Sequence, residues 1–466
     1  MRNDMDITPA QSVASAAGRL RDLRRLHVRR AVASARPGNR GTVLIVSMWV
    51  ILVLVGLVLV LGRSARVDAL SSANYVSSVQ ARAVAEGAAQ FVLSRVEPSK
   101  GDPASALAEP CKRVQVGDGF FWILRPDLGD DRDYAFGIRD EASRINLNSA
   151  STEMLLKIPG MTDELAPAIV DWRDQDSEVS PGGAESEYYL LLPEPYSCKN
   201  APFESIEEVL MVKGASSQIL YGEDANRNGI LDPNENDGDE SDPPDNADGH
   251  LDRGLLDFVT VDSREPNVSL SGEPRINVNQ PRSQELAALL REAAGDRFFQ
   301  VMDRVRAGRP FRNILDFYVR VGLKASEFRQ IADRLTTRGE QTIVGLVNVN
   351  TAPREVLLCL PGLDESDVAA LLAKRSDTGT DLSTLAWVAE ALPPEKAAEV
   401  GSYITTRSYQ FSADIVSVGG DGRAFKRTWL VLDTLSAPPG IACWSDLTSL
   451  GWPLDAETLS ELRSTT

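Results

Sequence analysis

The longest apolar run of the chain covers residues 42–61 and contains no charged residue. At about 1.5 Å per helical residue, a run of this length spans a membrane core of about 30 Å. Behind it, an alanine-rich stretch keeps a helical composition as far as Glu97, and Pro98 supplies the break because proline disrupts a helix interior. The pattern predicts one long helix over residues 42–97. Its first part would lie in a membrane and its second part in a globular head.

Alternating apolar and polar residues predict a small antiparallel sheet built from two distant parts of the chain. Short β-rich runs cover residues 113–116, 120–124 and 134–139, and two longer alternating runs flank a Gly-Asp-Gly turn at residues 420–422. Such a turn between two such runs is typical of a β-hairpin. We therefore expect an α+β fold in which a helical domain is inserted between the early and the late strands of one sheet.

The region between those strands contains an internal repeat that opens on an Asn-x-Asn signature. The three copies begin at Arg144, Arg275 and Val347. In the first and third copies a helical stretch, a Pro-Gly pair and a second helical stretch follow, which is the pattern of a helix-hairpin-helix. The second copy has Ala-Ala-Gly-Asp at residues 293–296 instead of Pro-Gly. Another apolar helical piece follows each copy, so we expect repeats similar to sterile-alpha-motif bundles.

Charge decides between two roles for these hairpins. In DNA-binding forms, the turn and the second helix present amide groups and basic side chains to phosphates. Here residues 162–164 and 364–367 place carboxylates at those positions, and the whole chain has a net charge of −18. Because carboxylates repel phosphates, a structural or protein-binding hairpin is favoured. A membrane-anchored helix-hairpin-helix protein that binds DNA is the alternative function.

The most acidic part of the chain, residues 223–256, contains a sequence typical of a calcium loop. Residues 224–235 match D-x-[DN]-x-[DN]-G-x5-E, in which alternate residues of a tight loop offer oxygen atoms to Ca²⁺. The expected ligands are the side chains of Asp224, Asn226, Asn228, Asp232 and Glu235, and the backbone carbonyl of Ile230. Pro233 disfavours a regular exiting helix, so we expect a single loop with a structural role.

A second acidic cluster follows the first within the same segment. This cluster, with Asp245, Asp248 and Asp252, has a similar core, Asp-Gly-x-Leu-Asp, although Pro244 stands in the first ligand position. The sequence leaves one or two calcium ions open. An acidic, solvated linker is the simpler interpretation of the whole segment. The ordered spacing of Asn and Gly favours calcium instead.

Other chemistry finds little support in the composition. The four cysteines contain no C-x-x-C pair, which argues against a zinc cluster. In an exported chain Cys111 and Cys198 could form a disulfide, but their spacing does not decide it. There are two histidines, and no H-E-x-x-H, Walker or G-x-S-x-G motif. A calcium-dependent hydrolase therefore lacks a candidate nucleophile and base, and no catalytic residue is predicted.

The segment before the apolar run orients the chain. Residues 1–41 carry nine arginines and three aspartates, a net charge of +6, so residues from 42 onward are expected to be exported. No small-x-small site follows the run, so a conventional signal peptide fits poorly, whereas an ordinary signal anchor fits. Arg40-Gly41-Thr42 also resembles a prepilin-peptidase site, where a basic leader is cut after glycine and the apolar helix is retained.

These features together resemble the K-type minor pseudopilin of type II secretion systems. Besides the Arg-Gly junction, the Asn-x-Asn repeats and the acidic loop, Val46 occupies the fifth mature position, where most pilins carry Glu. The resemblance implies cleavage by prepilin peptidase between Gly41 and Thr42, followed by N-methylation. It implies a non-enzymatic, single-pass inner-membrane protein with a periplasmic head. That head would join I-type and J-type minor pseudopilins at the pseudopilus tip, without nucleic acid.

These inferences divide the chain into nine segments. We expect a basic cytoplasmic leader at 1–41, a transmembrane and pilin-type helix at 42–97, the first part of the sheet at 98–143, repeat one at 144–222, the calcium loop at 223–256, repeat two at 257–346, repeat three at 347–408, the closing hairpin at 409–436, and a tail with one short helix at 437–466.

Overall fold

The computed structural model describes residues 40–108, 111–238 and 240–464, in two units that cover residues 1–69 and 70–466. The predicted leader, residues 1–41, lies almost entirely outside the described part. Helix α1 (Arg40–Val96) begins in the first unit, where every large apolar side chain from Val43 to Leu61 is more than half exposed. Among the described residues, this helix is long and apolar enough to cross a membrane. The predicted long N-terminal helix is confirmed.

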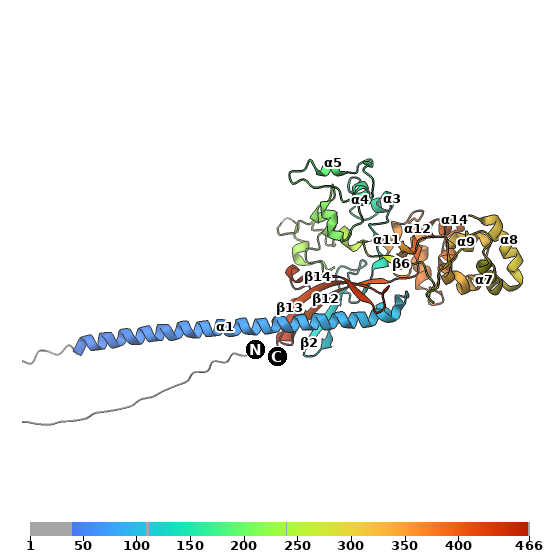
Figure 1. The fold of residues 1–466 in the computed structure, drawn as a ribbon. Helices are drawn as coiled ribbons and strands as arrows, with labels where there is room; N and C mark the ends of the chain where they lie inside the picture. Colours follow the sequence, from blue (N-terminus) through green and yellow to red (C-terminus); the bar gives the residue numbers. More distant parts are fainter. Residues whose placement is uncertain (1–39, 109–110, 239, 465–466) are drawn as a thin grey trace, which may run out of the picture. The chain divides into compact units, whose positions relative to one another are not determined.

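In the second unit, the later part of α1 packs on an antiparallel sheet (Figure 1). Val84, Ala88 and Val92 recur at helical spacing and are buried against sheet side chains such as Phe121 and Ile415. A short 3-10 turn, η1 (Glu97–Ser99), carries the expected proline and ends the helix. The helical spacing of these apolar residues therefore matches the face of the helix that is buried in the sheet core.

The sheet contains six strands in the described part of the chain. They are β1 (Val114–Val116), β2 (Gly119–Leu124), β3 (Arg139–Asp140), β12 (Gln410–Val418), β13 (Phe425–Asp433) and β14 (Gly440–Asp446). Their order is β1-β2-β12-β13-β14, with β3 beside the start of β12, and neighbours are antiparallel. The early strands β1–β3 and the late strands β12–β14 therefore share one sheet, and the small antiparallel sheet is confirmed.

Two parts of the predicted sheet were wrong. Residues 134–139 form a strand only from Arg139; before it, the chain follows the end of β2 through the bond from the Gly137 amide to the Ile123 carbonyl, 2.9 Å, without regular pairing. The tail contains an unpredicted strand, β14, in addition to a short helix, α15 (Ala456–Ser464). Because β14 is an edge strand with mostly exposed side chains, it lacks the alternation that reveals a strand.

Between β3 and β12 the chain is largely helical. Its elements are η2 (Glu141–Ser143), β4 (Ile145–Asn146), α3 (Thr152–Leu156), α4 (Leu165–Arg173), α5 (Ser186–Tyr189), η3 (Ile206–Met211), α6 (Ser217–Tyr221), η4 (Pro233–Glu235), η5 (Leu255–Asp257), β5 (Val259–Thr260), β6 (Arg264–Pro266), β7 (Ile276–Asn277), α7 (Gln284–Ala294), η6 (Gly295–Arg297), α8 (Phe298–Gly308), α9 (Ile314–Val321), α10 (Ala325–Ile331), η7 (Ala332–Arg334), β8 (Leu335–Thr336), β9 (Thr342–Val344), β10 (Val347–Asn348), α11 (Arg354–Leu358), α12 (Glu365–Ser376), α13 (Ala386–Ala391), α14 (Pro394–Val400) and β11 (Ile404–Thr405). The apolar helical piece expected after the first copy, at residues 203–210, overlaps the 3-10 helix η3.

The Asn-x-Asn signature has the same structural role in each of its three copies. The first asparagine accepts a hydrogen bond from the amide two residues later, at 2.8 Å for Asn146, 2.9 Å for Asn277 and 3.0 Å for Asn348. The second asparagine donates its side-chain amide to a later backbone carbonyl, at 3.0 Å for Asn148, 2.9 Å for Asn279 and 2.9 Å for Asn350. Each signature therefore closes a turn and ties it to the helical piece that follows.

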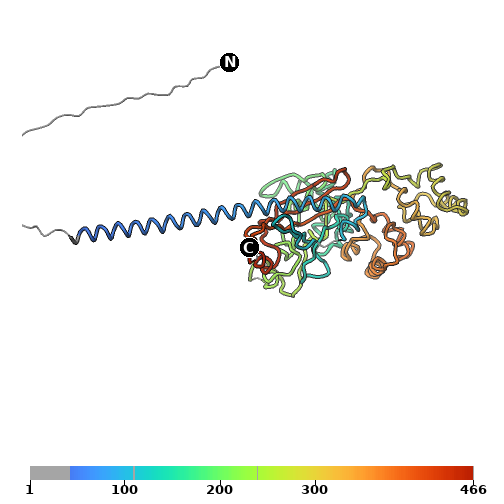
Figure 2. Tube along the Cα trace, turned by 90° about the horizontal axis from the view of Figure 1, so that it is seen from below, coloured from blue at the N-terminus to red at the C-terminus, as the bar shows by residue number. Residues whose placement is uncertain are grey.

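The copies differ in their cores. Side chains of the first and third copies share one hydrophobic cluster, whereas most buried side chains of the second copy form a separate cluster; Leu315 lies in the first of these and Ala386 in the second. Figures 1 and 2 show this second copy, with α7 and α8, at the end of the unit away from the acidic segment 223–256. Cys111 lies in the sheet core and Cys198 in the shared helical core, and no disulfide joins them in the described chain. The two cysteines that the sequence allowed to pair therefore lie in different cores.

Candidate metal centre

The predicted calcium loop lies between α6 and η5. Gly229 supplies its sharp bend with a φ of +77°, and a Cβ there would lie 3.1 Å from Pro126. A left-handed residue without a side chain is therefore needed at this point. The loop ends in the 3-10 turn η4, and α6, which precedes it, has only five residues. The loop thus matches the predicted calcium motif in sequence but lacks the two long helices of an EF-hand.

The loop gathers the predicted side chains around its interior. The Asp224 carboxylate accepts hydrogen bonds from the amides of Asn228 (2.9 Å) and Gly229 (2.8 Å). The Glu235 carboxylate closes the loop by accepting from the amides of Ala225 (2.9 Å) and Asp232 (3.0 Å). Asp232 in turn accepts from the side-chain amides of Asn226 and Asn228, at 2.6 and 3.0 Å. Ile230 is buried beside them.

The carboxylates of Asp224 and Glu235 are buried, so their negative charge needs compensation. Removal from water and the nearby charge of Asp257 together raise the pKa of Asp224 to about 6. Burial likewise raises the pKa of Glu235 to about 7, together with the charges of Asp224 and Asp232. In the described chain no ion pair reaches the carboxylates of Asp224, Asp232 or Glu235. The donor set consists of oxygen atoms, as hard divalent cations prefer, so these residues fit calcium.

Arg427 fastens the loop to the sheet. Its guanidinium donates to the backbone carbonyls of Asn226 and Arg227, the latter at 2.7 Å, and to the Asp414 carboxylate at 2.6 Å. Arg227 has a φ of +57°, so the loop is left-handed at the residue whose carbonyl accepts from the guanidinium. The loop conformation is thus supported from β13, at a distance of 200 residues in sequence.

The second acidic cluster repeats the geometry of the first. Ala247 and Gly249 have φ values of +53° and +81°, and the corresponding Arg227 and Gly229 have +57° and +77°. The side-chain amide of Asn246 donates to Asp252 at 3.0 Å, as Asn226 does to Asp232. Both clusters therefore fold as the same kind of loop.

Two residues next to the ends of the first loop occupy the end positions of the second loop. Asn236 accepts from the Gly249 amide at 2.9 Å, in the role that Asp224 has toward Gly229. Glu223 accepts from the amides of Asn246 (3.2 Å) and Asp252 (3.0 Å), much as Glu235 closes the first loop. These two residues were missed because they precede the cluster in sequence. In each of the adjacent pairs 223–224 and 235–236, one residue belongs to the first loop and its neighbour completes the second.

The three predicted residues of this cluster have different positions. Asp252 lies within the second loop. Asp248 accepts from the His250 amide at 2.8 Å, as Asn228 does from Ile230. Asp245 turns toward the preceding chain and accepts from the amides of Asp237 and Gly238, at 3.0 and 2.9 Å.

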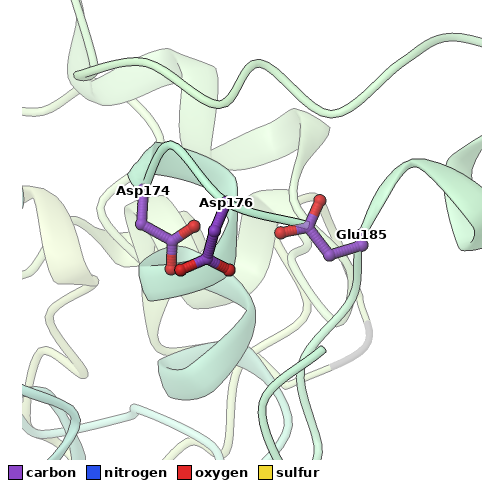
Figure 3. Close-up of side chains that lie close together, drawn as sticks. All are labelled: Asp174, Asp176 and Glu185. Carbon is purple, nitrogen blue, oxygen red and sulfur yellow. The ribbon is translucent and has the colours of Figure 1, made fainter. Parts of the chain in front are cut away.

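A third acidic cluster, outside this segment, was not predicted from the sequence. Oxygen atoms of Asp174, Asp176 and Glu185 lie within 4.8 Å of one another (Figure 3). Burial raises the pKa of both Asp174 and Glu185, and nearby carboxylates add to the rise; the Ser186 amide and Cys198 thiol partly offset it at Glu185. The only sequence signal was an Asp-x-Asp pair after a helix, which is too short to be specific.

Comparison with known proteins finds one family model that matches part of the chain. Residues 142–221 match the family model of protein K of the type II secretion system. We refer to residues 142–221 as the protein K segment because of this match. This segment contains the first Asn-x-Asn copy and runs to the last residue of α6, immediately before the acidic loops. The resemblance to the K-type minor pseudopilin is thereby confirmed over these residues.

Solved structures also match the chain. One of them is a chain in the crystal structure of the GspK–GspI–GspJ complex from the type 2 secretion system of enterotoxigenic Escherichia coli. The match covers 81% of this chain and 99% of that chain, with 11% identity and a TM-score of 0.42. No curated protein matches the chain. The protein K segment is therefore the observation on which the functional argument depends.

Proposed function

We propose that this chain acts as a minor pseudopilin of a type II secretion system, at the tip of the periplasmic pseudopilus, and has no enzymatic activity. The protein K segment carries the proposal. It lies in a helical domain between strands of a sheet, and the later part of a long apolar helix packs on that sheet. The proposed partners are I-type and J-type minor pseudopilins; the solved complex contains GspK with GspI and GspJ.

Two features support a position at the end of a filament. The fifth residue of the proposed mature chain is Val46, so it offers no carboxylate to the ammonium group of a neighbouring subunit in an apolar filament core. A subunit with no neighbour above it does not need that carboxylate. The helical domain is also larger than the sheet that carries it, which suits an end position better than repeated stacking along a shaft.

The test of this proposal is the N-terminus of the membrane-extracted protein. We expect intact mass and terminal sequencing to give a chain that begins with N-methylated Thr42. Substitution Gly41→Val should leave residues 1–41 attached, because prepilin peptidase cuts after glycine, while Gly38→Val in the same leader should not. A wild-type chain that retains its arginine-rich leader would contradict the proposal. Recovery of the I-type and J-type subunits with the processed chain then tests the position in the complex.

We also propose that the acidic segment binds calcium and that the ions order the two loops. Calcium should raise the thermal unfolding midpoint of the chain, because a ligand that binds only the folded state stabilises it. The double substitution Asp224→Asn with Glu235→Gln should remove most of this rise. Glu240→Gln, an exposed acid in the same segment, serves as the control and should keep it. An equal calcium response in the double variant would exclude the first loop as the site.

A further inference from the structure

The cluster of Asp174, Asp176 and Glu185 lies where two helices of the protein K segment meet. Asp174 ends α4, its amide bonded to the Val170 carbonyl at 3.1 Å, and Asp176 follows in the next turn. Glu185 precedes α5, but its side chain does not cap that helix. Figure 3 shows its carboxylate directed instead toward the other two.

Burial makes this arrangement costly for the bare protein. Glu185 is only 2% exposed, and neither of its side-chain oxygens has a hydrogen-bond partner of acceptable geometry. One carboxylate oxygen of Asp174 is also buried without a partner. A buried carboxylate normally has donors or a cation beside it, because desolvation without compensation is expensive. Here the unpartnered oxygens face further carboxylates.

Neighbouring cations supply only part of the missing charge: burial raises the pKa of Asp174, and the charge of Arg173 lowers it without forming an ion pair in the described chain. Arg173 precedes Asp174, but its guanidinium donates to the Ala150 carbonyl on the other side. Lys213 donates to the carbonyls of Gly182 and Gly183 and pairs with Glu164. Within the described residues, no ion pair reaches any of the three carboxylates. A fourth carboxylate, Asp171, is fully buried one turn earlier on α4 and also has one oxygen without a partner.

We propose that Asp174, Asp176 and Glu185 bind a divalent cation, separate from the ions of the acidic loops. The ion would lie among the three carboxylates and join the end of α4 to the start of α5. The intervening residues 177–184 would thereby form a closed loop. The inference concerns these residues alone and stands whether or not the chain is a pseudopilin.

The donor set selects the type of ion. Carboxylate oxygens suit hard cations, and the group of ligating side chains at this site contains carboxylates alone. Ca²⁺ accepts irregular sets of six to eight oxygens, whereas Mg²⁺ requires near-octahedral geometry. Calcium is the ion that we expect.

The test compares bound calcium in variants of the full mature chain, purified in detergent. The parent carries Asp224→Asn and Glu235→Gln, so that the first acidic loop does not contribute. Equilibrium dialysis against calcium followed by elemental analysis gives the number of ions per chain. Addition of Glu185→Gln should lower this number by one, and Asp176→Asn, at an exposed position, should do the same. Glu187→Gln, an exposed acid two residues away, should leave the number unchanged.

Thermal unfolding separates a binding role from a structural one. With a chelator present, Glu185→Gln should be at least as stable as its parent, because it removes a buried charge. With calcium present, the parent should gain stability that the variant does not. Equal ion numbers in parent, Glu185→Gln and Asp176→Asn would overturn the proposal and show that the cluster holds a proton instead. Failure of the pseudopilin proposal would appear in the N-terminal analysis and leave this result unaffected.

Discussion

Replacement of Arg427 by methionine is expected to destabilise the head by about 3–5 kcal/mol and to weaken calcium binding by the first acidic loop. The Arg427 side chain is 0% exposed and grips the Asp414 carboxylate through Nε (3.0 Å) and Nη2 (2.6 Å). Its removal leaves a buried carboxylate without its counter-charge, which costs about 3–5 kcal/mol. The same change frees the carbonyls of Asn226 and Arg227, so the calcium affinity of the first loop should fall about tenfold or more. Chemical unfolding and calcium titration of the purified chain measure the two effects.

The neighbouring residue on β13 provides a matched control. Lys426 pairs with Asp446, whose side chain is 58% exposed, so Lys426→Met should cost at most about 1 kcal/mol. The double variant Arg427→Met with Asp414→Leu should recover most of the lost stability, because an apolar pair can replace a buried ion pair. It should not recover calcium affinity, since the loop carbonyls stay without a donor. Recovery of both properties would show that Arg427 does not support the loop.

The second large effect concerns the pH dependence of stability and centres on Asp140. This residue of β3 accepts hydrogen bonds from Ser408 (2.6 Å), Thr351 (2.5 Å) and the amide of Ala142 (2.9 Å). It connects the sheet to the third repeat. Burial raises its pKa to about 6, although these hydrogen bonds act in the opposite direction. Between pH 4 and pH 6 the folded state therefore holds more protons than the unfolded state.

The sign of the effect follows from this difference. Where the folded state binds more protons, stability falls as the pH rises, so the contribution of Asp140 is present at low pH and lost as the pH passes about 6. Asp140→Asn removes the ionisation. Relative to wild type, the variant should gain roughly 2 kcal/mol between pH 4.5 and pH 7.5. Unfolding with chelator present at several pH values measures this gain, and Asp118→Asn at an exposed turn should show none. A constant difference would contradict a raised pKa.

Local patterns sufficed for the parts of the fold that depend on nearby residues. The long helix followed from apolar spacing and from the proline at its end. The β12–β13 hairpin followed from alternation around its Gly-Asp-Gly turn, and the structure pairs Val418 with Phe425 directly across that turn. The Asn-x-Asn signature was also informative, because its first asparagine bonds to a backbone amide only two residues away.

Features that depend on distant residues were not predictable in the same way. Strand β14 is defined by its pairing with β13 and follows Pro438 and Pro439, which favour a tail. Glu223 and Asn236 complete the second acidic loop from outside its own sequence. Glu185 reaches Asp174 only because α4 and α5 fold together. Nothing in the sequence around Arg427 indicates that its side chain bonds to a loop two hundred residues earlier.

The two ends of the helical insertion emerge side by side, because Asp140 of β3 pairs with Phe411 of β12. The residues between β3 and β12 therefore act, for the sheet, as one long loop whose two ends are held together by the pairing of these strands. The entropic cost of closing a loop grows slowly with its length, by about 0.6 kcal/mol for each doubling. Evolution can therefore lengthen or shorten this domain at little cost to the sheet. The second repeat, with a core of its own, is the part most readily gained by duplication or lost by deletion.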